Sequence, residues 1–383
     1  MNDTNNVSNV PIPSAMEMES QNDKFVVIDH DLDCEFNSKN IECEPETSIV
    51  DNEIRQDNIA SDSNIKEKNK SNEKLFQDKS IQVTSGDFKV SFCSFIKTDQ
   101  DLITMCNIRN FKILDELSCL VDEAYPPSRK TLLNTREKII LTTAKLKLDI
   151  AFSALTILFN QVSEVTIRNV FYDTVKKLAS VLQSVVTRVT KEEIERNMPK
   201  CFQNFKATTS VLDCTEIKIQ KPKCLKCRIK LYSHYKGDLT VKFMTEVTPA
   251  GIIVFVSESF GGRASDKCIF NYSGILQNLE STRDAIMVDK GFLINEECLE
   301  KRIKLIRPPF LKNKQQLSEE EALLNREIAS ARVHVERMNQ RIKQFQLLNN
   351  KLPWYFINYI DDIFLICCGL ANLGIPILND DKF

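Results

Sequence analysis

The 383-residue sequence shows few signs of a membrane-directed segment. Its first ten residues contain no basic cluster and no apolar run, so we expect no secretory leader. The longest apolar run, Ile363–Leu378, is shorter than the roughly 20 residues that span a bilayer, and it contains Asn372 and Pro376. This run is therefore predicted to be a buried helix that packs on the core.

The sequence also lacks a disulfide framework. Its 13 cysteines are odd in number and show no paired spacing of the kind that small secreted domains use. Most of them are therefore expected to be free thiols in a reducing compartment. Cys224 and Cys227 have the spacing of a zinc-binding pair, but no second pair lies near them, so both zinc binding and free thiols remain open there.

The sequence as a whole has no large excess of either charge, because its net charge is only −2, but its two parts differ. Residues 1–80 contain 18 acidic and 8 basic residues, whereas the remainder contains 35 acidic and 43 basic residues. Only three aromatic residues lie within residues 1–85, and such a segment cannot bury enough apolar surface to offset its ordering entropy. We predict a disordered acidic tail over residues 1–90 and a basic body, an asymmetry that suggests a polyanionic partner.

Residues 98–200 have helical periodicity, with apolar residues recurring at helical spacing between residues 132 and 150. A break at Asn160–Gln161 separates two further helices, and Ser163 is placed to cap the second of them. Two short helices around a tight turn are typical of a helix-turn-helix. A purely structural helical hairpin has the same pattern, so both interpretations remain open for this all-helical region.

From Ala207 the periodicity changes to short β-rich runs, at residues 210–217, 242–247, 252–257 and 284–289. Turn signals at Thr248–Gly251 and Gly261–Gly262 separate them. Helical stretches are expected between the later runs and after Ser318. These features predict an α/β domain with a mixed sheet and flanking helices over residues 207–378.

Two carboxylates follow apolar runs of this domain. Asp213 follows Val211–Leu212, and Asp289 follows Ile286–Val288. We expect each to end its strand and to emerge at a sheet edge, where a desolvated carboxylate is costly unless a cation compensates it. Mg²⁺ is a suitable cation because it prefers oxygen ligands. An Asp that merely starts a turn after a strand is the alternative.

The last long helix is predicted to begin after Ser318, because Ser318 and Glu321 have the spacing of a capping box. Arg332, Glu336 and Lys343 lie at i, i+4 and i+11 of this helix, within roughly 40° of one another. Glu336 could be a third metal-binding carboxylate, flanked by cations that grip a phosphodiester backbone. The alternative is a solvated helix face with an i, i+4 ion pair.

Asp213, Asp289 and Glu336 together would form a three-carboxylate set. Two metal ions held about 3.5–4 Å apart by such a set clamp the attacking and leaving oxygens of a phosphoryl transfer. His334 lies two residues before Glu336, about 200° away around the helix. We therefore predict that His334 packs in the core and is not a ligand.

Seven short motifs, three of which contain these carboxylates, occur in the same order as in a known family. They are Asp213–Glu216, Tyr232–Lys236, Thr248–Gly251, Gly261–Asp266, Asp289–Phe292, Pro308–Phe310 and Ile328–Arg337. This pattern resembles the DDE-superfamily endonuclease domain of PIF/Harbinger-type transposases, especially the branch often fused to a THAP zinc finger. The resemblance implies an RNase H-like fold, transposase activity in the nucleus, Mg²⁺ or Mn²⁺, and a catalytic triad at Asp213, Asp289 and Glu336. It also favours an accessory helix-turn-helix before the domain, and a homodimer or higher multimer.

The sequence departs from that family in two respects. The segment that holds Cys34 and Cys43 has no Cys-Cys-Cys-His pattern, so we expect no zinc finger in this sequence. A fragment of a longer protein, a derivative that has lost its finger, and a member that relies on a separate DNA-binding partner protein all remain open. The acidic tail in its place would repel DNA. The spacing around Glu336 also resembles a signature of bacterial insertion-sequence transposases, but Ala329 stands where they have a tyrosine.

A basic segment follows the first predicted strand. Its cations are Lys218, Lys221, Lys223, Lys226, Arg228 and Lys230, with Leu225 and Tyr232 between or beside them. This segment could contact a DNA backbone, as could Lys236, Arg332 and Lys343. A solvated edge strand protected by lysines is the alternative.

Three functions therefore remain open at the level of sequence. The first is a metal-dependent nuclease that hydrolyses a DNA strand and transfers the resulting 3′ end to a target. The second is a catalytically silent DNA-binding or regulatory protein derived from a transposase. The third is an inert scaffold for protein interactions.

Overall fold

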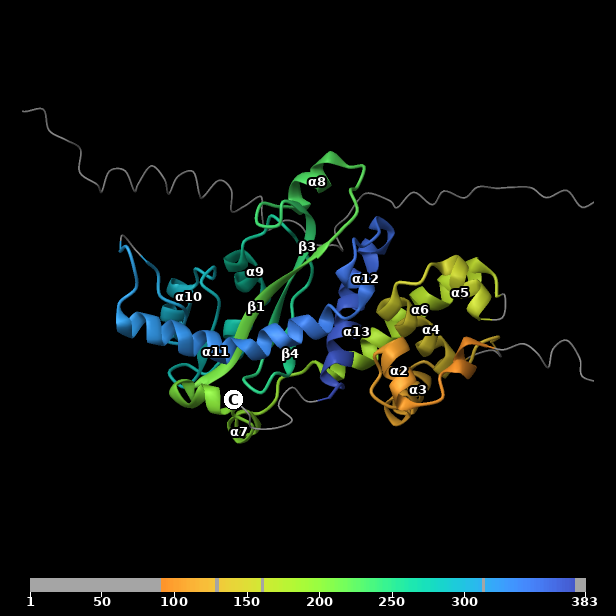
Figure 1. Ribbon diagram of the computed structural model, residues 1–383, viewed down its shortest axis with the longest axis horizontal. Helices are drawn as coiled ribbons and strands as arrows, with labels where there is room; N and C mark the ends of the chain where they lie inside the picture. The colour runs from red at the N-terminus through yellow and green to blue at the C-terminus, as the bar shows by residue number, and fades with distance from the viewer. Residues whose placement is uncertain (1–90, 128–130, 160–161, 312–313, 376–383) are drawn as a thin grey trace, which may run out of the picture.

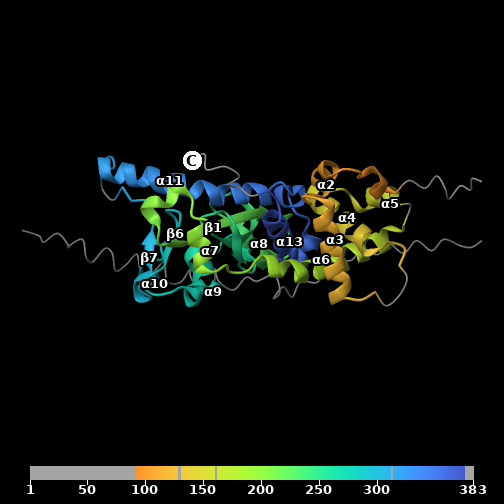
Figure 2. The ribbon, with the colours of Figure 1, turned by 90° about the horizontal axis from the view of Figure 1, so that it is seen from below.

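The computed structural model describes residues 91–127, 131–159, 162–311 and 314–375. The predicted tail over residues 1–90 and the predicted break at Asn160–Gln161 lie outside the described residues. A helical region and an α/β region lie side by side along the long axis of the molecule (Figures 1 and 2).

The helical prediction for residues 98–200 is confirmed where the chain is described. After the short η2 (Phe92–Phe95), the helices are α2 (Asp99–Cys106), α3 (Phe111–Ala124), α4 (Thr135–Leu148), α5 (Phe152–Leu158) and α6 (Glu164–Leu182). Ser163 caps α6 as predicted, because its side chain accepts a hydrogen bond from the backbone N–H of Thr166. Residues 139–146 of α4 are all buried, since α2, α3, α6 and α12 pack around it.

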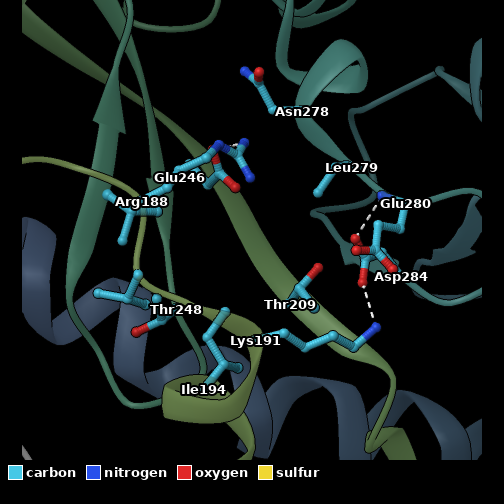
Figure 3. Close-up of a pocket in the computed structure, with 12 residues that line it drawn as sticks. Arg188, Lys191, Ile194, Thr209, Glu246, Thr248, Asn278, Leu279, Glu280 and Asp284 are labelled. Carbon is cyan, nitrogen blue, oxygen red and sulfur yellow. Dashed lines mark hydrogen bonds and ion pairs between the residues drawn. The ribbon is translucent and has the colours of Figure 1, made fainter.

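A connecting segment crosses from the helical region to the sheet through η3 (Gln183–Val185), α7 (Lys191–Arg196) and η4 (Lys200–Phe205). Two ion pairs dock it on the sheet (Figure 3). Arg188 pairs with Glu246 at 2.6 Å, and Lys191 pairs with Asp284 at 2.9 Å. Ser210 donates a second hydrogen bond to Glu246. The four residues of the two ion pairs line a cavity of about 160 Å³.

The sheet is mixed, as predicted. Its strands are β1 (Thr208–Lys218), β2 (Tyr232–Ser233), β3 (Asp238–Val247), β4 (Ile253–Val256), β5 (Phe260–Gly261), β6 (Ala285–Met287) and β7 (Lys304–Ile306). The order is β2-β3-β1-β6-β7, and β4 and β5 also pair with β3. β1 is antiparallel to β3 and parallel to β6, and β6 is parallel to β7. The four predicted β-rich runs are strands, whereas β2, β5 and β7 were not predicted.

One sequence prediction about β1 is wrong. Asp213 does not end its strand, because β1 continues to Lys218 and pairs with β3 along this whole length. The polar second half of β1 is stabilised from the neighbouring strand, where Lys242 lies opposite Glu216. A cross-strand partner of this kind cannot be read from the local sequence.

The two faces of the sheet pack into different cores. Val211 and Phe243 belong to the larger core, which includes α11 (Glu319–Ile342), α12 (Gln346–Asn349) and the helical region. Leu212 and Met244 belong to a smaller core with α9 (Asp266–Ser273) and α10 (Asn295–Glu300). This alternation follows from the period of two residues along a strand.

The C-terminal helix α13 (Ile360–Asn372) packs between the sheet and α6, after the short η6 (Trp354–Tyr359). Phe364 of α13 stacks on Phe243 of β3, with ring centroids 4.1 Å apart. By length and composition alone, Trp354–Asn372 could cross a membrane, but 61% of this stretch is buried inside the protein. A buried helix was predicted in this part of the chain and is confirmed up to Asn372.

Candidate active site

The lengths of two parallel strands bring Asp213 and Asp289 together. β6 ends at Met287, which pairs with Val211 of β1. Beyond that point β1 has a neighbouring strand only on the β3 side, where Asp213 lies opposite Thr245. The chain leaves β6 and reaches Asp289 two residues later. The two carboxylates therefore share the open edge of β1.

A single guanidinium joins these carboxylates. Arg332 of α11 places Nη1 3.0 Å from Oδ1 of Asp289 and Nη2 3.6 Å from Oδ1 of Asp213. The side chain of Arg332 is only 11% exposed, whereas that of Asp289 is 53% exposed. α11 can supply this contact because it packs across β1 (Figure 1). Arg332 was predicted to contact DNA, and here its charge is directed at the two carboxylates.

Asn339 is a site residue that was not predicted. Its side-chain amide donates a hydrogen bond of 2.6 Å to Oδ2 of Asp213. Asn339 lies seven residues after Arg332 on α11, so the two side chains are about 20° apart around the helix. The sequence shows that Asn339 and Arg332 share a helix face, but a neutral amide does not stand out as a candidate ligand or phosphate contact. Asp213 is consequently held by α11 at both of its oxygens.

The environment of Asp213 makes its charged form less favourable than that of an exposed aspartate. The pKa of Asp213 is raised to about 6, mainly by burial; the charge of Arg332 opposes this shift, and the charges of Asp289 and Asp266 contribute to it. One cation thus faces several carboxylates. A carboxylate in this situation is stabilised by any additional cation that approaches it.

Glu336 lies on the same face of α11, one turn after Arg332, and its residue is exposed to solvent. It takes no part in the contacts between Arg332, Asn339 and the two aspartates. Across the described ranges, no group of three or more His, Cys, Asp or Glu side chains is arranged to hold a metal ion. The structure therefore brings Asp213 and Asp289 together, whereas Glu336 is exposed on α11.

The donor atoms nevertheless suit a divalent metal ion. Asp213 and Asp289 offer hard carboxylate oxygens, and these oxygens already converge on one cationic group. Mg²⁺ and similar ions are typically held by one or two carboxylates together with substrate phosphates. Glu336 is the nearest carboxylate along the same helix face that could complete the set.

Further charged residues support the sheet next to this site. Lys242 is 12% exposed, and its Nζ lies 3.3 Å from Asp266 and 3.8 Å from Glu216. It also donates a hydrogen bond to the backbone carbonyl of Ala264. Asp266 begins α9, so this network ties the start of α9 to β1 and β3. The charge of Asp266, a member of this network, is one of those that raise the pKa of Asp213.

His334 is buried, as predicted. Its ring stacks on Phe202, and its Nε2 lies 3.3 Å from Sγ of Cys201. Burial lowers the pKa of His334, so the neutral ring is favoured. The prediction that His334 packs in the core is confirmed.

The predicted basic residues surround a short helix and not an edge strand. Residues 225–231 form α8 (Leu225–Leu231), where Cys224 accepts a hydrogen bond from the backbone N–H of Cys227. Lys223, Lys226 and Lys236 are exposed, and Lys230 is half-buried. Arg228 donates hydrogen bonds to the carbonyls of Pro222 and Lys223, so part of its role is to close this loop. Lys343 caps the C-terminus of α11 and is exposed.

Residues 212–372 match the DDE superfamily endonuclease family. This matched region begins one residue before Asp213 and includes Asp289 and Glu336. The chain is also 30% identical over 142 residues to the probable transposase for insertion sequence element IS702 of Microchaete diplosiphon. That similarity covers 37% of this chain and 48% of the relative, so the chain spans about half the length of the relative that it matches.

Proposed function

We propose that the DDE endonuclease-like region makes this chain a divalent-metal-dependent DNA nuclease of the transposase type, with Asp213, Asp289 and Glu336 as its triad. The convergence of Asp213 and Asp289 on the single guanidinium of Arg332 carries this proposal. Similarity to a family of endonucleases and to a probable transposase supports DNA as the substrate. The finer assignment to the PIF/Harbinger type belongs to the same proposal.

Each residue has a separate part in the proposed reaction. Asp213 and Asp289 would hold a pair of Mg²⁺ or Mn²⁺ ions, and Glu336 would complete the ligand set from α11. A bound pair of such ions supplies the Lewis acidity that in-line phosphoryl displacement requires. Asn339 keeps one oxygen of Asp213 in place through its hydrogen bond. Arg332 neutralises part of the carboxylate charge and lies where it can approach a phosphate of the substrate.

The proposed reaction has two steps. In the first step, the oxygen of a water molecule attacks a phosphodiester phosphorus, and the bond from that phosphorus to the 3′ oxygen breaks. In the second step, the 3′-hydroxyl so formed attacks a phosphodiester of the target DNA and displaces a new 3′ oxygen. Both steps pass through the same charge distribution, so the same carboxylates serve both.

DNA contacts are proposed for Lys223, Lys226, Arg228, Lys230 and Lys236 around α8, and for Lys343 at the end of α11. Residues 98–200 are proposed to bind DNA as an accessory helix-turn-helix-like region. Both groups would act mainly through the phosphate backbone, so binding should weaken steeply with salt. A nuclear location, assembly into a dimer or higher multimer, and a separate DNA-binding partner protein complete the proposal.

A catalytically silent DNA-binding protein is the second candidate. The observation that favours it is that Glu336 is exposed and that Asp213, Asp289 and Glu336 do not form a group arranged to hold a metal ion in the described structure. Under this alternative, DNA binding persists while no metal supports cleavage.

Plasmid nicking by the purified full chain with Mg²⁺ or Mn²⁺ separates the two candidates. We expect nicking by the wild type and none by Asp289→Ala or Glu336→Ala. Glu320→Ala, at an exposed position on the same helix, is the matched control and should nick normally. Equal nicking by wild type and Glu336→Ala would remove Glu336 from the triad. Absence of nicking in the wild type, with DNA binding retained, would favour the silent protein.

A further inference from the structure

The turn between β1 and β3 carries an exposed apolar surface. We call residues 218–237 the β1–β3 tip; it contains α8 and β2 and projects beyond the sheet at the end far from α7 (Figure 1). Tyr235 is 84% exposed, Leu225 is 68% exposed, and Ile229 and Tyr232 are about half exposed. Neighbouring apolar side chains displayed in this way on a protein surface commonly mark a binding site.

The charge of the tip specifies the kind of partner. It contains seven Lys and Arg residues and no Asp or Glu. The carboxylate that follows the tip, Asp238, is paired with Lys351 at 3.0 Å and with Lys218 at 3.8 Å. The Nζ of Lys236 lies 4.5 Å from the ring centroid of Tyr235, so a cation and an aromatic face are presented together. An anionic partner that also offers flat apolar faces fits this surface.

The tip is a fixed platform. Leu231 and Ser233 are buried at its base, and the backbone N–H of Arg263 donates to the carbonyl of Lys230. A Cβ at Gly262 would lie only 2.8 Å from the carbonyl oxygen of Leu231, so the residue that follows β5 approaches the tip closely. The exposed side chains are therefore held outward by a packed backbone. A rigid aromatic display reduces the ordering cost of binding.

We propose that the β1–β3 tip binds unpaired bases of DNA, with Tyr232 and Tyr235 as stacking surfaces and the lysines as phosphate contacts. This inference rests on the proposed function, because it takes DNA as the substrate. A fully paired duplex would satisfy the lysines through its phosphates but would leave the tyrosine rings without a partner. Bases expose their faces only where the strands are separated, and base–aromatic stacking together with a basic surface is how proteins bind single strands.

Fluorescence anisotropy of the full chain in EDTA tests this proposal without cleavage. The probes are a labelled single strand of mixed sequence, a forked duplex of the same strand and a blunt duplex. We expect Tyr232→Ala and Tyr235→Ala each to weaken binding of the single strand and the fork by about tenfold, as the loss of one stacked base predicts. Binding of the blunt duplex should change less than twofold.

Two sets of variants sharpen the outcome. Tyr272→Ala on α9 removes a tyrosine that is 67% exposed outside the tip, and it should leave the affinity for all three probes unchanged. Lys226→Ala and Lys236→Ala should weaken binding of all three probes and reduce its salt dependence. Equal losses for duplex and single strand in the tyrosine variants, or no loss in either, would overturn the stacking proposal.

The result is separable from the proposed nuclease activity. Glu336→Ala should keep the preference for the single strand and the fork even where it abolishes nicking. Wild-type protein that nicks plasmid but binds single strands no better than Tyr235→Ala does would contradict only the inference about the tip.

Discussion

The sheet carries two pairs of carboxylates, one against the connecting segment and one against α11, and the two pairs are compensated differently. Against the connecting segment, Arg188 pairs with Glu246 and Lys191 with Asp284, one cation for each acid. Against α11, Arg332 alone serves both Asp213 and Asp289. In the first pair both acids are buried and each has its own cation, whereas the second pair retains negative charge and is open to solvent through Asp289.

This difference indicates which carboxylates are available for chemistry. Buried acids that are fully paired mainly fix the connecting segment on the sheet, and breaking such a pair is costly for folding. Acids that share one cation can accept another, and they lie where β6 has ended and left the edge of β1 open. The same residue type therefore has a structural part at one end of β6 and a proposed catalytic part at the other.

The same substitution in the two carboxylate pairs should give opposite results, and this is the largest expected effect. Asp213→Asn should lower metal-dependent nicking by at least about a thousandfold, because several kcal/mol of transition-state stabilisation depend on the metal ligands. Its free energy of unfolding should be unchanged or higher, since burial already opposes the charge of Asp213. The measurements are nicking rates and urea unfolding.

Asp284→Asn should instead lower the free energy of unfolding by about 1–2 kcal/mol, because a buried hydrogen-bonded charge is lost. Its nicking rate should stay within about threefold of wild type under conditions where it is folded. If Asp213→Asn proved the less stable variant and Asp284→Asn the inactive one, the structural and catalytic parts assigned to the two pairs would be reversed.

The next effect concerns the stability of the connecting segment. Arg188→Ala should destabilise the protein by about 2–3 kcal/mol at pH 7, because it leaves Glu246 buried without its cation. Burial already raises the pKa of Glu246, so the folded state binds this proton more tightly than the unfolded chain does. Lowering the pH through the raised pKa should therefore reduce the deficit of Arg188→Ala.

Urea unfolding between pH 7 and pH 5 measures this deficit. Arg196→Ala, at an exposed cation of α7, is the control and should change stability by less than about 0.5 kcal/mol. A deficit of Arg188→Ala that is constant with pH would mean that the uncompensated charge of Glu246 is not its cause.

A smaller effect concerns pH and metal affinity. The pKa of Asp213 is raised to about 6, so below pH 6 a proton occupies this ligand and competes with a metal ion. We expect the affinity for Mn²⁺ to be nearly constant from pH 7 to pH 8 and to fall by up to about tenfold for each unit below pH 6. Isothermal titration across this range measures it. An affinity that stays constant down to pH 5 would remove Asp213 from the ligand set.

Much of the fold could be predicted from sequence because its signals are local. Ser163 and Ser318 cap helices where their spacing to later residues predicted caps. The β-rich runs became strands because their apolar residues fill two cores. The extension of β1 to Lys218 depends on β3, and the helical form of α8 depends on the loop that Arg228 closes. Neither the length of β1 nor the helical form of α8 has a local signal in the sequence, because the first depends on a distant strand and the second on loop geometry.

The candidate site could be predicted in part for the same reason. The acids Asp213 and Asp289 follow apolar runs, which is a local signal, and the common helix face of Arg332 and Glu336 follows from helical geometry. The bridge from Arg332 to both aspartates depends on how α11 crosses the sheet, and the hydrogen bond from Asn339 depends on the same crossing. Neither can be obtained from spacing along one helix.

The most direct measurement is of Mn²⁺ binding to the wild type, Asp213→Asn and Arg332→Ala at pH 8, detected by electron paramagnetic resonance. Saturable binding by the wild type, its loss in Asp213→Asn, and binding about tenfold tighter in Arg332→Ala are expected, because the guanidinium lies where a metal ion would be held. Binding that is the same in all three proteins would contradict the claim that Asp213 and Asp289 form the metal-binding site on the sheet.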